Sequence, residues 1–461
     1  MGMTRATPRR AASTGGRATP PSLRESLPQR FARAAYSSLL RLGLPAYLLR
    51  VLWRGRAEPL YRAALGERVG FYRGAPPLAP GALWIHAVSL GETRAAAPLI
   101  DALRERLPGV RLLLTHGTAT GRAAGASLLR DGDAQAWLPF DTPGAVRRFV
   151  RRFRPAAGVL LETEVWPNLI AEATRLGVPM LLVNARLSER SRRRGRRVDA
   201  LLRPAFARLA HVAAQTGTDA ERLLEVGARC VEVLGNLKFD LTPDAATMAR
   251  GRAWRGAVGE RRVVLAAVTR EGEEARLLAS WQRVAAPPLL VIVPRHPQRF
   301  DAVADLVVEA GFTLARRSRW DDAPSAADGA ADVWLGDSMM EMPAWYVLAD
   351  VALLGGSFAP LGGQNLIEAA ACGCPLVVGP HTFNFEDAAE RAIEAGAAAR
   401  VPDIDAAVER ALAWLEPGAA DARRDRAARA FAFASAHRGA AASTAERIAQ
   451  VLAGRADEHG G

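Results

Sequence analysis

The stretch ALWIHAVSLGETRAAAPLIDALRERL, residues 82 to 107, shows the pattern from which the fold can be inferred. It starts as an apolar run, turns through HAVSLGET (86–93), and continues in the spacing of an amphipathic helix. The turn contains a single acid, Glu92, next to Gly91. An acid at a helix start can complement the helix dipole or can take a proton from a substrate, and the stretch alone leaves both open.

The same strand-then-helix unit recurs along the chain. Continuous apolar runs that alternate with helical patterns are typical of parallel sheets covered on both faces. The runs form two sets, which predicts an α/β protein with two doubly wound domains joined near residues 240–248. The predicted strands are residues 82–88, 111–117, 156–162, 179–185, 211–215 and 231–236 in the first set, and 262–268, 288–294, 332–337, 350–356 and 374–380 in the second.

Length and composition agree with this organisation. The chain has 461 residues, of which 49% are hydrophobic, enough for two or three globular domains. Its three cysteines are too few for a disulfide framework and fit a reducing compartment. Two of them form C-x-C in AACGCPLVV, which we interpret as small buried residues between a helix and a strand. No cluster of His, Asp and Cys predicts a metal site.

Positive charge is concentrated at the N-terminus. Residues 1–75 hold fourteen arginines against three acids, which accounts for eleven of the thirteen net positive charges. Such an arm favours an anionic surface, either nucleic acid or anionic lipid. Because the rest of the chain has no basic stripe interleaved with aromatic residues, we predict no nucleic-acid partner.

Residues 31–55, FARAAYSSLLRLGLPAYLLRVLWRG, mix leucines, aromatics and arginines. The uncharged run between Arg41 and Arg50 is far shorter than the roughly 20 residues that span a bilayer as a helix. The segment therefore predicts an amphipathic helix lying in the membrane interface, with packing against the first domain as the alternative. The preceding residues are predicted to be disordered and lack the layout of a signal peptide.

Charged and amide residues follow the predicted strands of both sets. In open α/β sheets, ligands bind beyond the carboxyl ends of the strands. We therefore expect a functional site in a cleft between the domains. The loops that would build it are HAVSLGE, LLETEVWPN, NARLSERS and GNLKFD from the first set, and TREGEE, VPRHPQRF, LGDSMMEM, GGSFAPLGGQNLIEAA and GPHTFNFED from the second.

The second set has the character of a nucleotide site. The glycines of GGSFAPLGG let backbone amides approach a ligand, and the helix that opens after them suits a phosphate. Glu368 falls one turn into that helix, and Arg270 and Arg295 add cations at neighbouring strand ends. The sequence has no dinucleotide G-x-G-x-x-G, Walker A or G-x-S-x-G signature in the required context.

Five residues of the first set have competing interpretations. We expect a helix N-terminus to favour the ionised form of Glu92. His86 lies within a strand and is either a packed histidine or a sugar contact. Lys238 is either solvated or part of the cleft. Glu162 and Glu164 would point to opposite sides if their strand continued through both, so at most one is expected to reach the site.

Nine motifs together resemble one family, the bacterial 3-deoxy-D-manno-octulosonic acid (Kdo) transferases that act on lipid A. The resemblance implies a GT-B fold, a CMP-Kdo donor, a tetra-acylated lipid A precursor as acceptor, inversion at the anomeric carbon and no metal cofactor. Family members usually begin with a more continuously apolar helix than this one. The motifs, in order between about residues 50 and 390, are WIHAVSLGE, ETEVWPN, NARLSERS, GNLKFD, TREGEE, PRHPQRF, GGSF, GGQNLIEA and GPHTFNF.

The resemblance also assigns residues. It makes Glu92 the general base and Glu162 and Lys238 stabilisers of the transition state. It implies association with the cytoplasmic face of the inner membrane. The CMP-binding residues that it implies are Pro294, Arg295, Met340, Glu341, Met342, Asn365, Leu366, Ile367 and Glu368.

The expected organisation has five parts, and two rival functions stay open. The rivals are another GT-B nucleotide-sugar transferase or epimerase, and a non-catalytic protein that binds lipid or nucleic acid through its basic arm. The arginine-rich run at 188–197 either contacts lipid phosphates or is a solvated loop. The expected parts are a disordered extension (1–30), a membrane-associating helical segment (31–75), an acceptor domain (76–242), a CMP-Kdo domain (243–425) and a C-terminal helix and tail (426–461).

Overall fold

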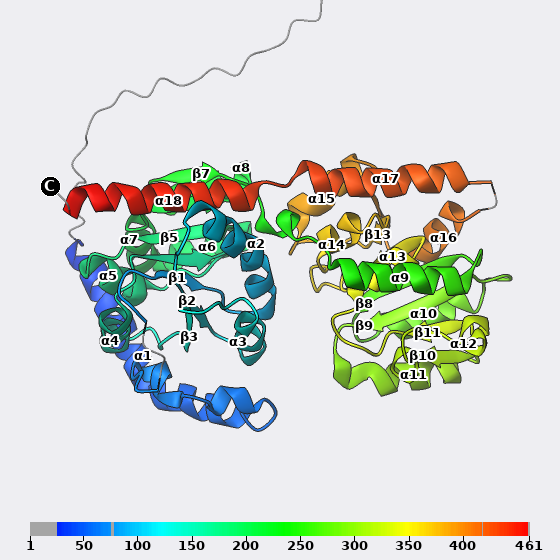
Figure 1. The fold of residues 1–461 in the computed structure, drawn as a ribbon, viewed down its shortest axis with the longest axis horizontal. Coiled ribbons are helices and arrows are strands. Elements are labelled where there is room, and N and C mark those ends of the chain that lie inside the picture. The colour runs from blue at the N-terminus through cyan, green and yellow to red at the C-terminus, as the bar shows by residue number, and fades with distance from the viewer. Residues whose placement is uncertain (1–24, 75–77, 417, 460–461) are drawn as a thin grey trace, which may run out of the picture.

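The computed structural model describes residues 25–74, 78–416 and 418–459. Two seven-stranded sheets, parallel throughout, lie side by side, each covered by helices on both faces (Figure 1). Of the expected disordered extension (1–30), residues 1–24 lie outside the described residues. Its last residues differ from the prediction, because helix α1 already begins at Leu27.

The first sheet has the strand order β3-β2-β1-β4-β5-β6-β7. Alternate residues of β1 enter two different cores, with Trp84 on one face of the sheet and Leu83 and Ile85 on the other. The strands are β1 (Leu83–His86), β2 (Leu112–His116), β3 (Ala134–Trp137), β4 (Ala157–Leu161), β5 (Met180–Ala185), β6 (His211–Ala214) and β7 (Val231–Val233). The helices are α2 (Leu90–Arg106), α3 (Ala119–Ala126), α4 (Pro143–Phe153), α5 (Pro167–Arg175), α6 (Glu189–Gly195), α7 (Asp199–Ala207) and α8 (Gly217–Glu225).

The second sheet has the order β10-β11-β9-β8-β12-β13-β14. Its two cores again divide the alternate residues of one central strand, with Leu265 on one face and Val264 and Ala266 on the other. The strands are β8 (Val263–Thr269), β9 (Leu289–Pro294), β10 (Leu314–Arg316), β11 (Val333–Leu335), β12 (Val351–Leu354), β13 (Leu376–Val378) and β14 (Ala398–Arg400). The helices are α9 (Ala245–Val258), α10 (Glu273–Trp281), α11 (Phe300–Glu309), α12 (Ala326–Ala330), α13 (Met342–Leu348), α14 (Leu366–Ala371), α15 (Glu386–Glu394) and α16 (Ile404–Trp414).

Each sheet has a point where the chain reverses its direction of travel across the strands. In the first sheet β4 pairs with β1, and in the second β12 pairs with β8. Loops that leave such neighbouring strands diverge and leave room for a ligand at their carboxyl ends. The segments that follow β1 and β4 carry Glu92, in the first turn of α2, and Glu162, and those after β8 and β12 carry Arg270 and the Gly355–Gly356 pair.

Helix α1 (Leu27–Arg54) lies along the first domain and meets it through polar contacts as well as apolar ones (Figure 1). The hydroxyl of Ser37 donates to Oδ1 of Asn168 over 3.0 Å, and the hydroxyl of Tyr36 donates to Oδ2 of Asp141 over 3.0 Å. Short 3₁₀ turns η1 (Pro59–Arg62) and η2 (Leu65–Val69) then lead to the sheet. Across the described ranges, the structure has no helix whose length and apolar character would let it cross a membrane.

The chain crosses between the domains twice. The first crossing follows η4 (Leu237–Asp240), and α9 begins at Ala245, inside the stretch expected to be a linker. The second follows α17 (Ala420–Ala436), after which α18 (Ala440–His459) returns to pack on the first domain (Figure 1). The Asp240 carboxylate accepts from the backbone N–H groups of Gly439 (2.6 Å) and Ala441 (2.7 Å), so the two crossings are joined.

Candidate active site

Glu92 lies in the first turn of α2, where the sequence places a capping pair. Ser89 is the N-cap, and its Oγ accepts from the Glu92 N–H over 3.4 Å. In return the Ser89 hydroxyl donates to Oε1 of Glu92 over 3.0 Å, and the Val88 N–H donates to Oε2 over 2.8 Å. This arrangement differs from a capping box, because the Glu92 carboxylate accepts from the N–H of Val88 rather than from that of the N-cap Ser89, and it holds the carboxylate at the carboxyl end of β1.

The pKa of Glu92 is raised, whereas its position at a helix N-terminus leads us to expect a lowered pKa. The net pKa is raised to about 7: burial raises it most, the hydrogen bond from the Val88 N–H lowers it, and the Glu164 and Glu162 carboxylates add to the rise. The expected stabilisation of the ionised form is therefore outweighed, because desolvation penalises a charge more than one helix end favours it. A carboxylate that titrates near neutrality is well matched to accept a proton at pH 7.

Three glutamates share this side of the domain boundary. Strand β4 ends at Leu161, and Glu162 then adopts a left-handed backbone with φ of 57°. The expectation that at most one of Glu162 and Glu164 reaches the site assumed that the strand continues through both; the strand ends before them, and both carboxylates lie near enough to Glu92 to raise its pKa. Glu164 accepts from the Trp166 indole N–H over 2.8 Å, and burial raises its pKa as well.

Lys238 is an ion-pair partner rather than a solvated lysine. Its Nζ lies 2.7 Å from Oε1 of Glu162, and the two side chains are only 15% and 16% exposed. The loop that carries Lys238 is fixed by Asn184, whose Oδ1 accepts from the Leu237 N–H over 3.0 Å. The Nδ2 of Asn184 is buried and has no hydrogen-bond partner in the structure.

Three cations of the first domain reach loops of the second. Lys238 Nζ lies 5.1 Å from the centre of the Phe385 ring. Arg186 donates to the Asn384 carbonyl over 2.5 Å, and its Nε lies 4.0 Å from Oε2 of Glu162. Arg94, two residues beyond Glu92, donates to the Met340 sulfur. The loops expected to form one site are therefore brought together from both domains.

On the facing side, Arg270 and Arg295 occupy the ends of the neighbouring strands β8 and β9. The Arg295 N–H donates to the Thr269 carbonyl over 3.0 Å, which fixes the two ends side by side. Burial, the charge of Arg270 and then that of Arg94 lower the pKa of Arg295. An accumulation of cations with mutual repulsion of this kind is typical of a site for an anionic ligand.

Backbone glycines bring the facing loops close together. A Cβ at Gly355 would lie 2.5 Å from the Val268 carbonyl oxygen, so the β8 and β12 ends could not approach as they do with any other residue there. Gly356 has a φ of 70°, and its N–H is held by the Glu273 carboxylate at 2.8 Å. The glycines expected to serve a ligand thus also shape the loop that would bind it.

Met340, Glu341 and Met342 are expected to bind CMP, but their side chains have three different environments. The Glu341 carboxylate is held within the domain by Arg250 at 2.5 Å and Arg317 at 2.9 Å. Met342 begins α13 and packs against the core. Met340 is 64% exposed with a φ of 69°, so it is the side chain of the three that faces outward.

The side chains of the segment 365–368 also have different environments. Asn365 caps α14 by accepting from the Ile367 N–H over 3.1 Å, and the Leu366 and Ile367 side chains are buried in the core. Burial raises the pKa of Glu368, and the charge of Arg94 in the other domain opposes that rise. Pro294, the remaining predicted residue, is the last residue of β9 and precedes Arg295.

Strained backbone marks the same strand ends. Besides Met340 and Glu162, a positive φ is found at Asn184 in β5 (52°) and at Val268 in β8 (58°). Both coincide with irregularities in the strand register. A β-branched residue in this conformation is costly and is kept where the surrounding structure demands it, most often at functional sites. Sequence patterns do not report φ, so this signal is visible only in the structure.

His86 is a packing histidine. Its Nδ1 lies 2.9 Å from Oγ1 of Thr115, and burial lowers its pKa to about 3, so the ring is neutral at pH 7. The side chain is 1% exposed, which rules out a contact with a sugar in this arrangement. Its place inside β1 rather than after it explains the difference from Glu92.

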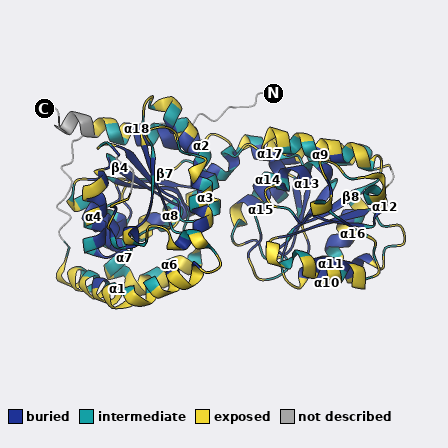
Figure 2. Ribbon diagram, turned by 60° about the horizontal axis from the view of Figure 1, so that its bottom comes forward, coloured by how far each residue is buried: buried dark blue, intermediate teal, exposed yellow. Residues whose placement is uncertain are grey.

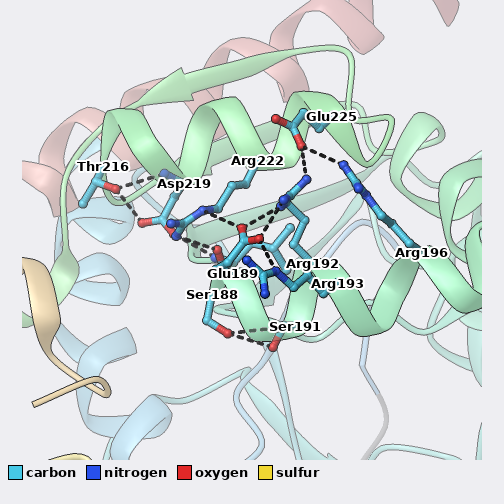
Figure 3. A network of polar contacts seen from close by, with 11 residues as sticks. Ser188, Glu189, Ser191, Arg192, Arg193, Arg196, Thr216, Asp219, Arg222 and Glu225 are labelled. Carbon is cyan, nitrogen blue, oxygen red and sulfur yellow. Dashed lines mark hydrogen bonds and ion pairs between the residues drawn. The ribbon is translucent and has the colours of Figure 1, made fainter. Parts of the chain in front are cut away.

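The arginine-rich run is α6 and the following turn η3 (Arg196–Val198), not a loop. Figure 3 shows that part of its charge is neutralised internally, because Glu189 pairs with Arg192 and Arg193 at 2.7 Å and Glu225 pairs with Arg192 at 2.6 Å. Arg190, Arg194 and Arg197 remain exposed. One part of the run is therefore paired within the protein. The exposed arginines are left for either alternative, contact with lipid phosphates or solvation.

Within the part of the chain that the structure describes, no group of three or more His, Cys, Asp or Glu residues is placed to bind a metal ion.

Comparisons with known proteins identify relatives of this chain. Residues 63–241 match the model of a family described as 3-deoxy-D-manno-octulosonic-acid transferase (kdotransferase). A 3-deoxy-D-manno-octulosonic acid transferase of Bordetella pertussis is 48% identical over 436 residues, 91% of this chain and 99% of the relative. That of Haemophilus influenzae is 34% identical over 83% of this chain and 90% of the relative. The crystal structure of a UDP-GlcNAc 2-epimerase from Neisseria meningitidis, 15% identical, covers 80% of this chain and 100% of its own with a TM-score of 0.55 and so shares the fold.

Proposed function

This chain belongs to the 3-deoxy-D-manno-octulosonic acid (Kdo) transferase family, and from that membership we propose that it moves Kdo from CMP-Kdo to a hydroxyl of the tetra-acylated lipid A precursor, lipid IVA. The observation that carries the proposal is the position of Glu92. Its carboxylate has a pKa near 7 and lies at the boundary where loops of the two domains meet. In this reaction it is the general base.

The chemistry follows from that assignment. Glu92 takes the proton from the acceptor hydroxyl as its oxygen forms a bond to the anomeric carbon of Kdo. The bond between that carbon and the phosphate oxygen breaks, and CMP leaves with the electron pair. Attack from the side opposite to the leaving group inverts the configuration. A base near neutral pKa is efficient because it is ionised at pH 7 and still basic enough to accept the proton.

Cations at the boundary stabilise the developing charge. Arg295 and Arg270, at adjacent strand ends, lie where they can offset the negative charge on departing CMP. Lys238, held by Glu162, completes the positive side near Glu92. In this proposal the three side chains supply charge that other transferases draw from a divalent metal.

A lipid acceptor requires access to a membrane surface, and α1 has a surface suited to it. Large apolar residues along one side of the helix are exposed, as its yellow outer side in Figure 2 indicates. Exposed arginines flank them, including Arg41 and Arg50. An apolar stripe bordered by arginines is typical of a helix in the interface of an anionic bilayer, here the cytoplasmic face of a Gram-negative inner membrane. The exposed residues are Leu27 (78%), Phe31 (77%), Leu39 (68%), Leu42 (80%), Leu49 (67%), Leu52 (40%) and Trp53 (67%).

One experiment tests donor, acceptor and product together. The purified protein is incubated with CMP-Kdo and lipid IVA, and the lipid product is analysed by mass spectrometry. The proposal predicts a lipid IVA that carries one or more Kdo residues, with CMP released in equal number. Parallel reactions with UDP-sugars address the alternative that the shared fold allows, another nucleotide-sugar transferase or an epimerase. Turnover of a UDP-sugar without turnover of CMP-Kdo would replace the proposal.

A further inference from the structure

Arg94 links the proposed base to the donor side of the boundary. It follows Glu92 by two residues in the first turn of α2, and its Nη2 donates to the sulfur of Met340, a residue 246 positions away in the other domain. A thioether is a weak acceptor. An anionic oxygen would therefore displace this contact readily.

The charge of Arg94 is less compensated than that of Lys238 or Arg186. Lys238 is paired with Glu162 at 2.7 Å, and Arg186 lies 4.0 Å from the same carboxylate. Within residues 25–74, 78–416 and 418–459, no carboxylate lies within ion-pair distance of the Arg94 guanidinium, although Glu368 is near enough to feel its charge. Arg94 also repels Arg295 across the boundary, where Arg270 adds a third cation.

This arrangement matches the charges of the proposed donor. In this octulosonic acid the carboxylate is bonded directly to the ketone carbon. That carbon is the anomeric carbon that the acceptor attacks. The donor thus presents two anions, one on the phosphate and one beside the reacting carbon. The phosphate fits Arg270 and Arg295, which belong to the donor side. The carboxylate is bonded to the same carbon as the phosphate oxygen, so it must lie beside the phosphate, and the Arg94 guanidinium is close enough to Arg295 to lower the pKa of that residue.

We propose that Arg94 binds the carboxylate of the transferred sugar and so selects an acidic sugar over a neutral one. The inference rests on the proposed function. Arg94 would also orient the sugar, because a guanidinium can bind a carboxylate through two parallel hydrogen bonds. Its contact with Met340 in the structure would give way to the carboxylate when the donor binds.

The test separates carboxylate binding from CMP binding. Arg94→Gln should lower kcat/KM for CMP-Kdo by about 100-fold, as expected when one partner of a desolvated charge pair is removed. The Kd for CMP, which has the phosphate but no carboxylate, should stay within about twofold. Arg94→Lys should recover part of the loss. Arg276→Gln, the same charge change on an exposed part of α10, should leave both constants unchanged.

A donor analogue completes the test. CMP-Kdo with a carboxamide in place of the carboxylate should be as poor a substrate for the unmodified protein as CMP-Kdo is for Arg94→Gln, and the variant should lose little more with it. Three results would each overturn the inference. They are an equal loss of kcat/KM on both donors when Arg94 is replaced, a Kd for CMP that weakens as much as kcat/KM falls, and a kcat/KM for CMP-Kdo that does not change. Failure of the unmodified protein to use CMP-Kdo would instead overturn the proposed function.

Discussion

The ammonium group of Lys238 lies 2.7 Å from Oε1 of Glu162, although the two residues are 76 positions apart. The pair joins the end of β4 to η4, the turn that precedes the first crossing between the domains. It also keeps the Glu162 carboxylate, which raises the pKa of Glu92, next to a compensating charge.

Lys238→Met should therefore impair the reaction in two ways. The transition state loses a nearby cation, and Glu92 is exposed to an uncompensated Glu162. We expect kcat to fall by about 100-fold and the apparent pKa of the pH–rate profile to rise. Steady-state kinetics between pH 5 and 9 measure both, and the double variant Glu162→Gln/Lys238→Met is the control. If the effects of the two substitutions are simply additive, the pair is not coupled.

The pH dependence of transfer should report Glu92. A base must be ionised to accept a proton, so kcat/KM should rise with pH, with unit slope below the pKa of about 7 and a plateau above it. Buffers of constant ionic strength and saturating acceptor isolate the effect of Glu92 ionisation on kcat/KM. A profile that is flat from pH 5 to 8 would contradict the burial-raised pKa of Glu92.

Much of the fold is predictable from the sequence, and the exceptions share a cause. Each of the eleven predicted apolar runs contains a strand. The three that were missed, β3, β10 and β14, are edge strands whose sequences AQAW, LAR and AAR are short and include a polar or charged residue. An edge strand need not be apolar on both faces, so its sequence lacks the continuous apolar run that identifies a central strand.

The site is less fully predictable. The position of Glu92 after β1 follows from the strand pattern, but its pKa depends on burial and on two glutamates from another loop. Asn184 and Arg94 were missed because their contacts, with Leu237 and Met340, are made between segments far apart in the chain. The turn at Glu162 depends on a backbone conformation that no spacing rule reports.

The exposed apolar side of α1 should determine membrane binding. Leu39→Ser/Leu42→Ser/Leu49→Ser removes three exposed leucines and should weaken binding to anionic vesicles by about tenfold or more, since each buried leucine contributes on the order of 1 kcal/mol in an interface. Co-sedimentation with vesicles of anionic lipid measures this.

A matched control removes exposed apolar residues elsewhere. Leu224→Ser/Val308→Ser/Phe431→Ser changes side chains that are 50%, 61% and 53% exposed on other helices. It should leave vesicle binding unchanged. Equal weakening by both triple variants would mean that α1 is not the membrane-binding element.

Chelation should have little effect on the rate. The proposed mechanism assigns the charge on departing CMP to Arg270 and Arg295, so EDTA should leave kcat within about twofold. Enzyme dialysed against chelator and assayed with and without added Mg²⁺ makes the comparison. A loss of activity that Mg²⁺ restores would show that a metal shares this task.

Glu92→Gln removes the base with the least change of shape, and its folding can be checked independently. The pKa of Glu92 in the folded chain, about 7, lies above the ordinary value of 4.5, so stability from its protonated form is present below pH 4.5 and is lost as pH rises through 7. At pH 8 the buried charge destabilises the fold. The melting temperature of Glu92→Gln at pH 8 should therefore be no lower than that of the unmodified protein.

The most direct test of the account is the rate of Kdo transfer by this variant, measured with saturating CMP-Kdo and lipid IVA and accompanied by its Kd for CMP. With Glu92 as the general base, transfer should fall by about a thousandfold while the Kd for CMP stays within about twofold. Transfer at more than a tenth of the unmodified rate would contradict the central claim that Glu92 takes the proton from the acceptor.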